Sequence, residues 1–241
     1  MSKVLEKYSD EIKKSIDGSM IFYPSTDTIK KTTKYNSDFI VNKMRSFEAA
    51  ANIMSVCPGM KVAVLNFASA KKPGGFVEGG SAAQEEALCR VSTLYNVISN
   101  KKFKTDYYDF HLKQHNDLYS DRLIYSPDIV VIKDDDFNDL DKPLMLDVIT
   151  CPAPNLRQIT IDDNNLFLIQ YSRITNIIRA AAKNNVDILV LGAFGCGVFK
   201  NNPEVVAKAI KKAIEDSPYK FYKVVCPVFC RDWETANYDK F

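Results

Sequence analysis

Two short apolar runs in the sequence, residues 62–67 and 188–191, are each followed by a glycine cluster and then by a helical pattern. A short unbroken apolar run suits a strand that is buried on both faces. Strands that alternate with helices imply crossover connections. The sequence therefore predicts an α/β fold, with a largely parallel sheet and helices on both of its faces.

The other expected elements follow from periodicity and from turn residues. Ser37 or Asp38 would begin a helix over 38–56, which the sequence Cys57-Pro58-Gly59 would end. Residues 99–128 have no clear period and are expected to form a long surface excursion. The remaining helices are expected at 3–16, 84–98, 166–183 and 203–214, and the remaining strands at 129–132, 144–150 and 221–229.

A chain of 241 residues is long enough for one large domain or two small ones. There is no internal repeat and no linker rich in Gly, Ser or Pro, which favours a single domain over 1–241. Residues 1–56 would be a helical extension packed on that domain.

Composition limits the function classes. A net charge of +2 gives no reason to expect membrane or nucleic-acid binding. The N-terminus lacks a signal-peptide core, and six cysteines without a C-x-x-C pair indicate reduced thiols. His111 and His115 lack the pattern of a zinc site. We expect a cytoplasmic monomer without a metal ion or cofactor.

The two glycine clusters are candidates for a ligand site. In open α/β sheets, ligands bind beyond the carboxyl ends of the strands, and glycine loops bring backbone N–H groups close to phosphates. Tight turns are the alternative explanation. The phosphate-loop and dinucleotide motifs are both absent, which leaves a phosphate-bearing ligand held without lysine or magnesium. The glycines concerned are Gly74, Gly75, Gly79, Gly80, Gly192, Gly195 and Gly197.

Glu85 and Glu86 open the helix after the first cluster. Neighbouring helical residues point about 100° apart, so the two carboxylates cannot share one task. They could simply stabilise the first helical turn. A bound phosphate would instead raise the pKa of a nearby glutamate, which could then protonate a leaving group and activate water. Most glycosidases use two carboxylates that face each other across the sugar, and the adjacent residues Glu85 and Glu86 cannot supply that arrangement.

At this point the chain resembles the poly(ADP-ribose) glycohydrolases of the compact microbial type, whose glycine triplet is followed after six to eight residues by Gln-Glu-Glu. The resemblance covers roughly residues 40–240. It rests on Gln84-Glu85-Glu86 after Pro73-Gly74-Gly75-Phe76 and on the segments "VLNFASAKKPGG", "AQEEALCRVSTLY", "LYSDRLIYSPDIVV", "DVITCPAPNLR" and "LGAFGCGVFKNNPEVVAKA".

The resemblance implies a macrodomain that binds ADP-ribose or poly(ADP-ribose) on modified macromolecules and hydrolyses ribose–ribose bonds. Glu86 would be the acid/base, Glu85 would orient the scissile ribose, and Asn66 would contact that ribose beside Gln84. Phe199 would pack over the substrate. The diphosphate would lie against the backbone of Gly74, Gly75, Gly195, Cys196, Gly197 and Val198.

Phe76 stands where the family has its third glycine, unless a residue is inserted nearby and Phe76 is the usual residue after the glycines. In the ungapped alignment, the Cβ and ring of phenylalanine would disfavour a positive φ and would fill space beside the distal ribose or a phosphate. Cleavage of polymer would then be weakened, or the substrate would be a single ADP-ribose on a protein, nucleic acid or small molecule. A third alternative is a non-catalytic reader of ADP-ribose.

Overall fold

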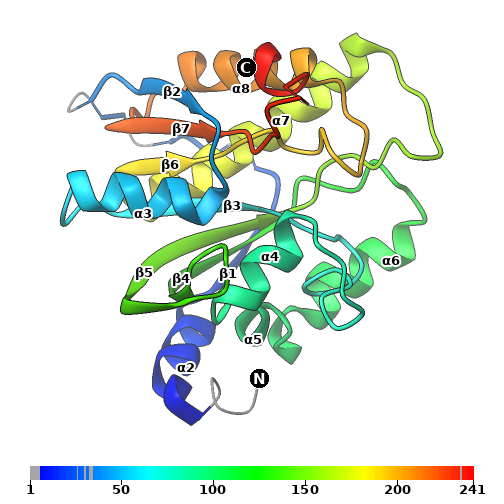
Figure 1. The fold of residues 1–241 in the computed structure, drawn as a ribbon. Helices are drawn as coiled ribbons and strands as arrows, with labels where there is room; N and C mark the ends of the chain where they lie inside the picture. The colour runs from blue at the N-terminus through cyan, green and yellow to red at the C-terminus, as the bar shows by residue number, and fades with distance from the viewer. Residues whose placement is uncertain (1–5, 26, 30, 33–34, 234) are drawn as a thin grey trace.

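The described residues form one seven-stranded sheet in which β5, β3, β6, β7 and β2 run parallel (Figure 1). This computed structural model describes residues 6–25, 27–29, 31–32, 35–233 and 235–241. β1 and β4 are antiparallel to their neighbours. In spatial order the strands are β1 (Met20–Phe22), β4 (Leu123–Lys133), β5 (Asp139–Cys151), β3 (Val62–Phe67), β6 (Ile188–Val190), β7 (Lys223–Pro227) and β2 (Asp38–Asn42).

Two hydrophobic clusters lie on opposite faces of this sheet. Along β3, Ala63 and Leu65 belong to one cluster, whereas Val62 and Val64 belong to the other, as the alternation of side chains along a strand requires. The first cluster packs under α7 (Asp163–Lys183) and α8 (Pro203–Asp216), and the second under α2 (Ser9–Gly18), α3 (Ser46–Val56), α4 (Gln84–Val91) and α5 (Leu94–Ile98). The predicted α/β/α layers are confirmed, and β3 is central in them.

The N-terminal third differs from the prediction. Residues 38–42 form strand β2 beside β7, not the first turn of a helix. The apolar run around Ile40 fits an edge strand as well as a helix, and pairing with β7 decides between them. Helix α3 begins only at Ser46, where the Glu48 side chain accepts from the Arg45 amide at 3.1 Å. The predicted cap at Ser37 or Asp38 is therefore wrong, although the helix does end at the predicted break. Of the helix expected over 3–16, residues 3–5 lie outside the described part of the chain.

The segment 99–128 is not a surface excursion. It contains η1 (Lys101–Phe103), η2 (Lys104–Asp109) and α6 (Phe110–Gln114), and β4 begins within it. Phe103, Tyr107 and Tyr108 are buried in a cluster of their own with Ile124, so the aromatic residues that gave no period form a local core.

The two histidines do not share a site. His111 is fully buried, and its ring nitrogens pair with Tyr107 O at 2.8 Å and Ser120 Oγ at 2.9 Å, whereas His115 is exposed beyond the end of α6. Across the described residues, no group of three or more His, Cys, Asp or Glu side chains is placed to hold a metal ion. All six cysteines are free thiols.

The helix predicted over 84–98 is broken in two. Ser92 is extended, with φ −146° and ψ 177°, and forms a bridge with Val131. Thr93 exchanges hydrogen bonds with Val130 through its backbone amide and its Oγ1, both at 3.0 Å. The contacts of these two polar residues with β4 end helix α4, and the chain becomes helical again at α5. Strand β1 (Met20–Phe22), which pairs with β4, was not predicted from the sequence. The other strands and helices lie where expected, although β4 and β5 are longer than predicted.

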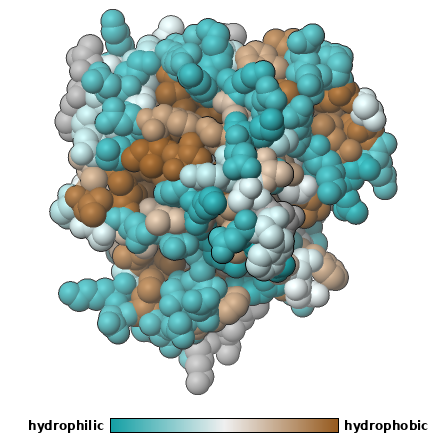
Figure 2. Space-filling model, turned by 45° about the horizontal axis from the view of Figure 1, so that its top comes forward, coloured by the Kyte–Doolittle hydropathy of each residue, from teal (hydrophilic) through white to brown (hydrophobic). Residues whose placement is uncertain are grey.

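On the face drawn in Figure 2, hydrophobic side chains gather in separate patches that hydrophilic residues surround. Within the described residues, no helix combines the length and the apolar character that a membrane span needs.

Candidate active site

Gln84 fixes the start of α4 over the carboxyl end of β3. Its Oε1 accepts from the Phe67 amide at 2.8 Å, and its Nε2 donates to Leu65 O at 2.8 Å and to Ser46 Oγ at 3.0 Å. The side-chain amide of Gln84, which was expected to contact the ligand, is thus hydrogen-bonded to protein atoms. Its local effect is to hold the next two residues of the helix at the edge of the sheet.

Glu85 is 3% exposed and is hydrogen-bonded through both oxygens. Oε2 accepts from the Ser69 amide at 2.7 Å, and Oε1 accepts from Asn66 Nδ2 at 3.3 Å. Burial raises the pKa of Glu85 to about 8. Hydrogen bonds from Ser69, Asn66 and Gly74 lower this pKa and so oppose part of the effect of burial.

Asn66 also reaches Thr150, with Nδ2 to Oγ1 at 3.2 Å. Its Oδ1 is buried and accepts no hydrogen bond from any described residue. A buried acceptor left open in this way is costly without a ligand or water.

Glu86 is 7% exposed and leaves one oxygen open. Oε1 accepts from the Phe76 amide at 3.0 Å. Oε2 is buried, and within the described structure nothing donates to it. The two carboxyls both lie against Gly75, so they do not turn away from each other as expected, but their hydrogen bonding differs: both oxygens of Glu85 are held, whereas one oxygen of Glu86 is open in the described structure.

The first glycine loop lies directly against these carboxyls. Gly75 has φ +58°, and a Cβ there would lie 2.4 Å from Glu86 Oε1 and 3.2 Å from Glu85 Oε2. Gly74 has φ +66°, and its Cβ would lie 2.6 Å from the ring of Tyr95. Both positions therefore require glycine, for backbone conformation and for space.

Phe76 does not replace a left-handed glycine, since its φ is not positive. Its side chain is 57% exposed, its ring lies against Gly79, and Lys72 Nζ is 5.0 Å from the ring centroid. The backbone of Phe76 contacts Glu86 while its ring lies on the outside of the loop.

The second glycine loop follows β6 and is organised by Asn201. Gly195 has φ +81°, and a Cβ there would lie 2.9 Å from Asn201 Nδ2. That nitrogen donates to Pro154 O at 2.7 Å and to Gly195 O and Phe199 O, both at 3.2 Å. Gln170 Nε2 donates to Asn201 Oδ1 at 2.8 Å. Asn201 was not singled out from the sequence, although it lies within the segment "LGAFGCGVFKNNPEVVAKA".

Several backbone amides of the second loop are open. The Cys196 amide donates to Ala193 O at 3.1 Å, but in the described part of the chain nothing accepts from the amides of Gly195, Gly197 and Val198. Gly197 and Val198 are exposed. Cys196 is buried, which raises its thiol pKa to about 12, so the thiol is unsuited to nucleophilic attack.

Tyr119 lies between the two glycine loops. Its ring centroid is 6.3 Å from that of Phe199, and Lys71 Nζ lies 5.4 Å from the same tyrosine ring. Lys71 also pairs with Asp117 at 2.9 Å. Tyr119 has φ +57°, an uncommon conformation for such a residue. It lies within the segment "LYSDRLIYSPDIVV", but it was not singled out from the sequence.

A further aromatic side chain lies beyond the end of β7. Phe229 is 55% exposed, and the Arg45 guanidinium carbon lies 4.1 Å from its ring centroid. Arg45 follows β2, the strand next to β7, so this pair lies on the same edge of the sheet as both glycine loops.

Comparison with known proteins identifies the family. The family model described as microbial-type PARG, catalytic domain, matches residues 3–134, where PARG stands for poly(ADP-ribose) glycohydrolase. The chain belongs to this family. The enzyme class expected from the sequence, a glycosidase, is the class of the family. No curated protein matches the sequence.

Solved PARG structures share the whole fold. PARG from Thermomonospora curvata is 30% identical, with a TM-score of 0.88 over 100% of this chain and 94% of that one. Its complex with the inhibitor ADP-HPD has a TM-score of 0.85 at 30% identity, over 100% and 96%. PARG from Deinococcus radiodurans in complex with ADP-ribose has a TM-score of 0.84 at 30% identity, over 95% and 96%. The macrodomain-like fold inferred from the resemblance is confirmed.

Proposed function

We propose that this enzyme hydrolyses ribose–ribose O-glycosidic bonds of poly(ADP-ribose) and releases ADP-ribose, with Glu86 as general acid and base and without a metal ion. The observation that carries the proposal is Glu86 Oε2, a buried carboxyl oxygen at the carboxyl end of the central strand to which no described residue donates. The relatives crystallised with ADP-ribose and ADP-HPD support the ligand class.

Glu85 has the raised pKa that an acid needs, yet geometry favours Glu86. Both oxygens of Glu85 accept hydrogen bonds from the protein, so neither is free to meet a leaving group. Glu86 has one oxygen held and one open. Reach comes before pKa when the acid is assigned.

The proposed reaction needs one carboxyl group. Protonated Glu86 gives its proton to the leaving ribose oxygen while the bond from that oxygen to the anomeric carbon breaks. An oxocarbenium-like centre forms, water attacks it, and the proton of that water returns to Glu86. The Phe76 amide holds the carboxyl through Oε1, while Asn66 Oδ1 and Glu85 lie where a sugar hydroxyl would be oriented.

The order of strands suggests how the substrate lies. β3, β6, β7 and β2 are consecutive, and neighbouring strands are about 4.8 Å apart, so the edge from β3 to β2 spans roughly 14 Å. The two carboxyls, the open amides of the second loop and the ring of Phe229 lie along this edge in that order. This order matches a distal ribose, a diphosphate and an adenine.

The second loop is accordingly proposed as the main diphosphate site, through Gly195, Gly197 and Val198, with Phe199 beside the substrate. The Gly75 amide donates to Lys72 O at 3.1 Å, so contact of Gly74 and Gly75 with the diphosphate stays a prediction. Single-domain organisation over 1–241 and a monomeric cytoplasmic enzyme complete the proposal.

One assay tests the proposed function. The protein is incubated with poly(ADP-ribose) and, separately, with a protein carrying single ADP-ribose groups, and free ADP-ribose is measured with and without EDTA. We expect release from polymer that EDTA does not reduce. Release only from the single modification would reassign the substrate, loss of release with EDTA would refute metal independence, and binding without release would indicate a reader.

A further inference from the structure

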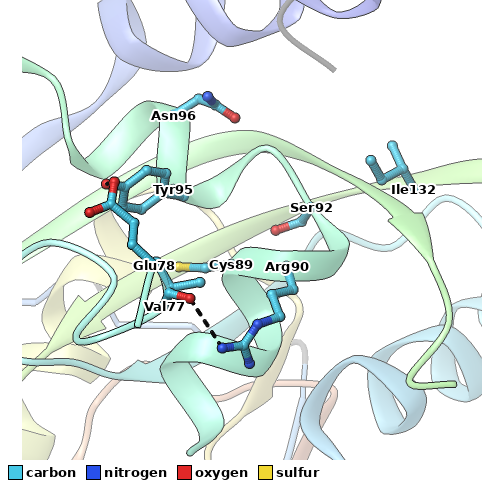
Figure 3. Close-up of a pocket in the computed structure, with 8 residues that line it drawn as sticks. All are labelled: Val77, Glu78, Cys89, Arg90, Ser92, Tyr95, Asn96 and Ile132. Atoms are coloured by element: carbon cyan, nitrogen blue, oxygen red, sulfur yellow. Dashed lines mark hydrogen bonds between the residues drawn. The ribbon is translucent and has the colours of Figure 1, made fainter. Parts of the chain in front are cut away.

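A cavity of about 230 Å³ lies between the first glycine loop and helices α4 and α5 (Figure 3). Val77 and Glu78 of the loop form one wall, and Arg90 of α4 and Tyr95 of α5 contribute to the others. The side chains of Arg90 and Tyr95 both reach back to the loop from these helices.

Arg90 lies one helical turn after Glu86, so both side chains project from the same face of α4. Its Nη2 donates to Val77 O at 3.2 Å, the contact drawn in Figure 3, and also to Ser81 O. One guanidinium nitrogen therefore joins two carbonyls of the loop, four residues apart. Glu86 and Arg90 hold the loop at successive points along one helix.

Tyr95 holds the loop at two further points. Its hydroxyl donates to Glu78 Oε1 at 2.7 Å, and its ring fills the space next to Gly74, where a Cβ would lie 2.6 Å away. The hydrogen bond to Glu78 raises the pKa of Tyr95 to about 12, so the hydroxyl keeps its proton.

The loop needs such support because its own hydrogen bonds are short-range turns. The amides of Gly75, Val77, Gly79 and Gly80 each donate to a carbonyl three residues earlier. A loop rich in glycine has many alternative conformations, while an acid in the wrong place by about 1 Å can cost about 10²-fold in rate.

We propose that Arg90 and Tyr95 are positioning residues, which hold the first glycine loop on α4 so that the Phe76 amide stays on Glu86. The inference rests on the proposed function, since the rate it affects is release of ADP-ribose. Neither residue needs to touch substrate, and the sequence alone singled out neither of them.

The test compares Arg90→Ala with Arg122→Ala, because Arg122 likewise donates to a backbone carbonyl, Asp106 O at 2.7 Å, outside this site. Loss of a hydrogen bond from a charged group predicts a fall in kcat of about 10- to 100-fold for Arg90→Ala. Hydrogen exchange should quicken in peptides covering 72–82 and remain unchanged elsewhere. Methylguanidinium, entering through the cavity, should restore activity in a saturable way.

Tyr95→Phe is expected to lower kcat by about 2- to 5-fold, in line with loss of one exposed hydrogen bond. Its control is Tyr171→Phe, because Tyr171 donates to Asp216 Oδ2 at 2.9 Å on the far helices α7 and α8. The control should keep its kcat.

Several results would overturn the inference. These are unchanged kcat in Arg90→Ala, unchanged exchange over 72–82, or loss of activity that follows a general loss of protection and is not rescued. If the wild type releases no ADP-ribose, the proposed function fails, and faster local exchange in Arg90→Ala would still show that the arginine holds the loop.

Discussion

The two glycine loops occupy equivalent places, each between a parallel strand and a helix, yet their backbone amides differ. In the first loop, Phe76 N–H is bonded to Glu86 and Gly75 N–H to a carbonyl within the loop. In the second, the amides of Gly195, Gly197 and Val198 have no acceptor in the described structure. Glycine clusters that look alike in sequence can thus serve different purposes.

The supports of the two loops also differ. The first is held from outside by the side chains of Arg90 and Tyr95. The second is held from within by the buried amide of Asn201, which joins three carbonyls. We infer that the first loop sets the position of the acid and that the second binds the diphosphate. Changes in the first should therefore lower kcat, and changes in the second should weaken binding.

The largest expected effect is that of Glu86→Gln. Glutamine keeps the volume and an acceptor for the Phe76 amide but cannot act as the acid, so kcat should fall by about 10²- to 10⁴-fold. The Kd for ADP-ribose, measured by calorimetry, should stay within a few-fold. Glu215→Gln on α8, an exposed position, is the control. Equal loss of affinity and rate would contradict the assignment.

Gly75→Ala should lower kcat by about 10- to 100-fold, because its methyl group would displace the Glu86 carboxyl. Gly59→Ala is the matched control, since Gly59 also has a positive φ, +81°, but nothing within 4 Å of an added Cβ. Both variants should lose about 1–2 kcal/mol of unfolding free energy from the strained backbone. Unchanged kcat in Gly75→Ala would show that the loop does not set the position of the acid.

Asn201→Ala should raise the Kd for ADP-ribose by about 10-fold and change kcat by less than about threefold, because loss of its hydrogen bonds frees the second loop. Asn176→Ala is the control, since Asn176 is also buried and donates to a carbonyl, Asp121 O at 2.6 Å. Titration calorimetry and steady-state rates separate the two quantities. A fall in kcat without a change in Kd would contradict this assignment, because the second loop would then affect the chemical step and not binding.

A separate expected effect is on stability against pH. The pKa of Glu85 is about 8 in the folded chain and 4.5 as the ordinary value. The folded state therefore binds more protons in that window, and stability falls as pH rises through it, by at most about 1.4 kcal/mol per unit. Burial also lowers the pKa of His111 from 6.5 to about 4. Between these two pH values the unfolded state binds more protons, so His111 makes stability rise with pH, opposite to the effect of Glu85.

The clean window for this measurement is therefore pH 6.5 to 8. Urea unfolding of the wild type should give a falling free energy there, and Glu85→Gln should remove that slope. An identical slope in both proteins would show that Glu85 is not the group that titrates.

The sequence was sufficient where local pattern decides structure. The strand at 62–67 and the helix start at Gln84 depend on neighbouring residues alone. Strand 38–42 was missed because its apolar run fits a helix too, until β7 pairs with it. Arg90 and Asn201 could not be found, since their contacts join residues that only the folded chain brings together.

The division of labour between the loops is tested most directly by a crystal structure of Glu86→Gln with ADP-ribose. We expect diphosphate oxygens within hydrogen-bond distance of the amides of residues 195, 197 and 198, and the distal ribose beside the side chain at position 86. A diphosphate held by the first loop instead, or a ribose remote from position 86, would contradict the account.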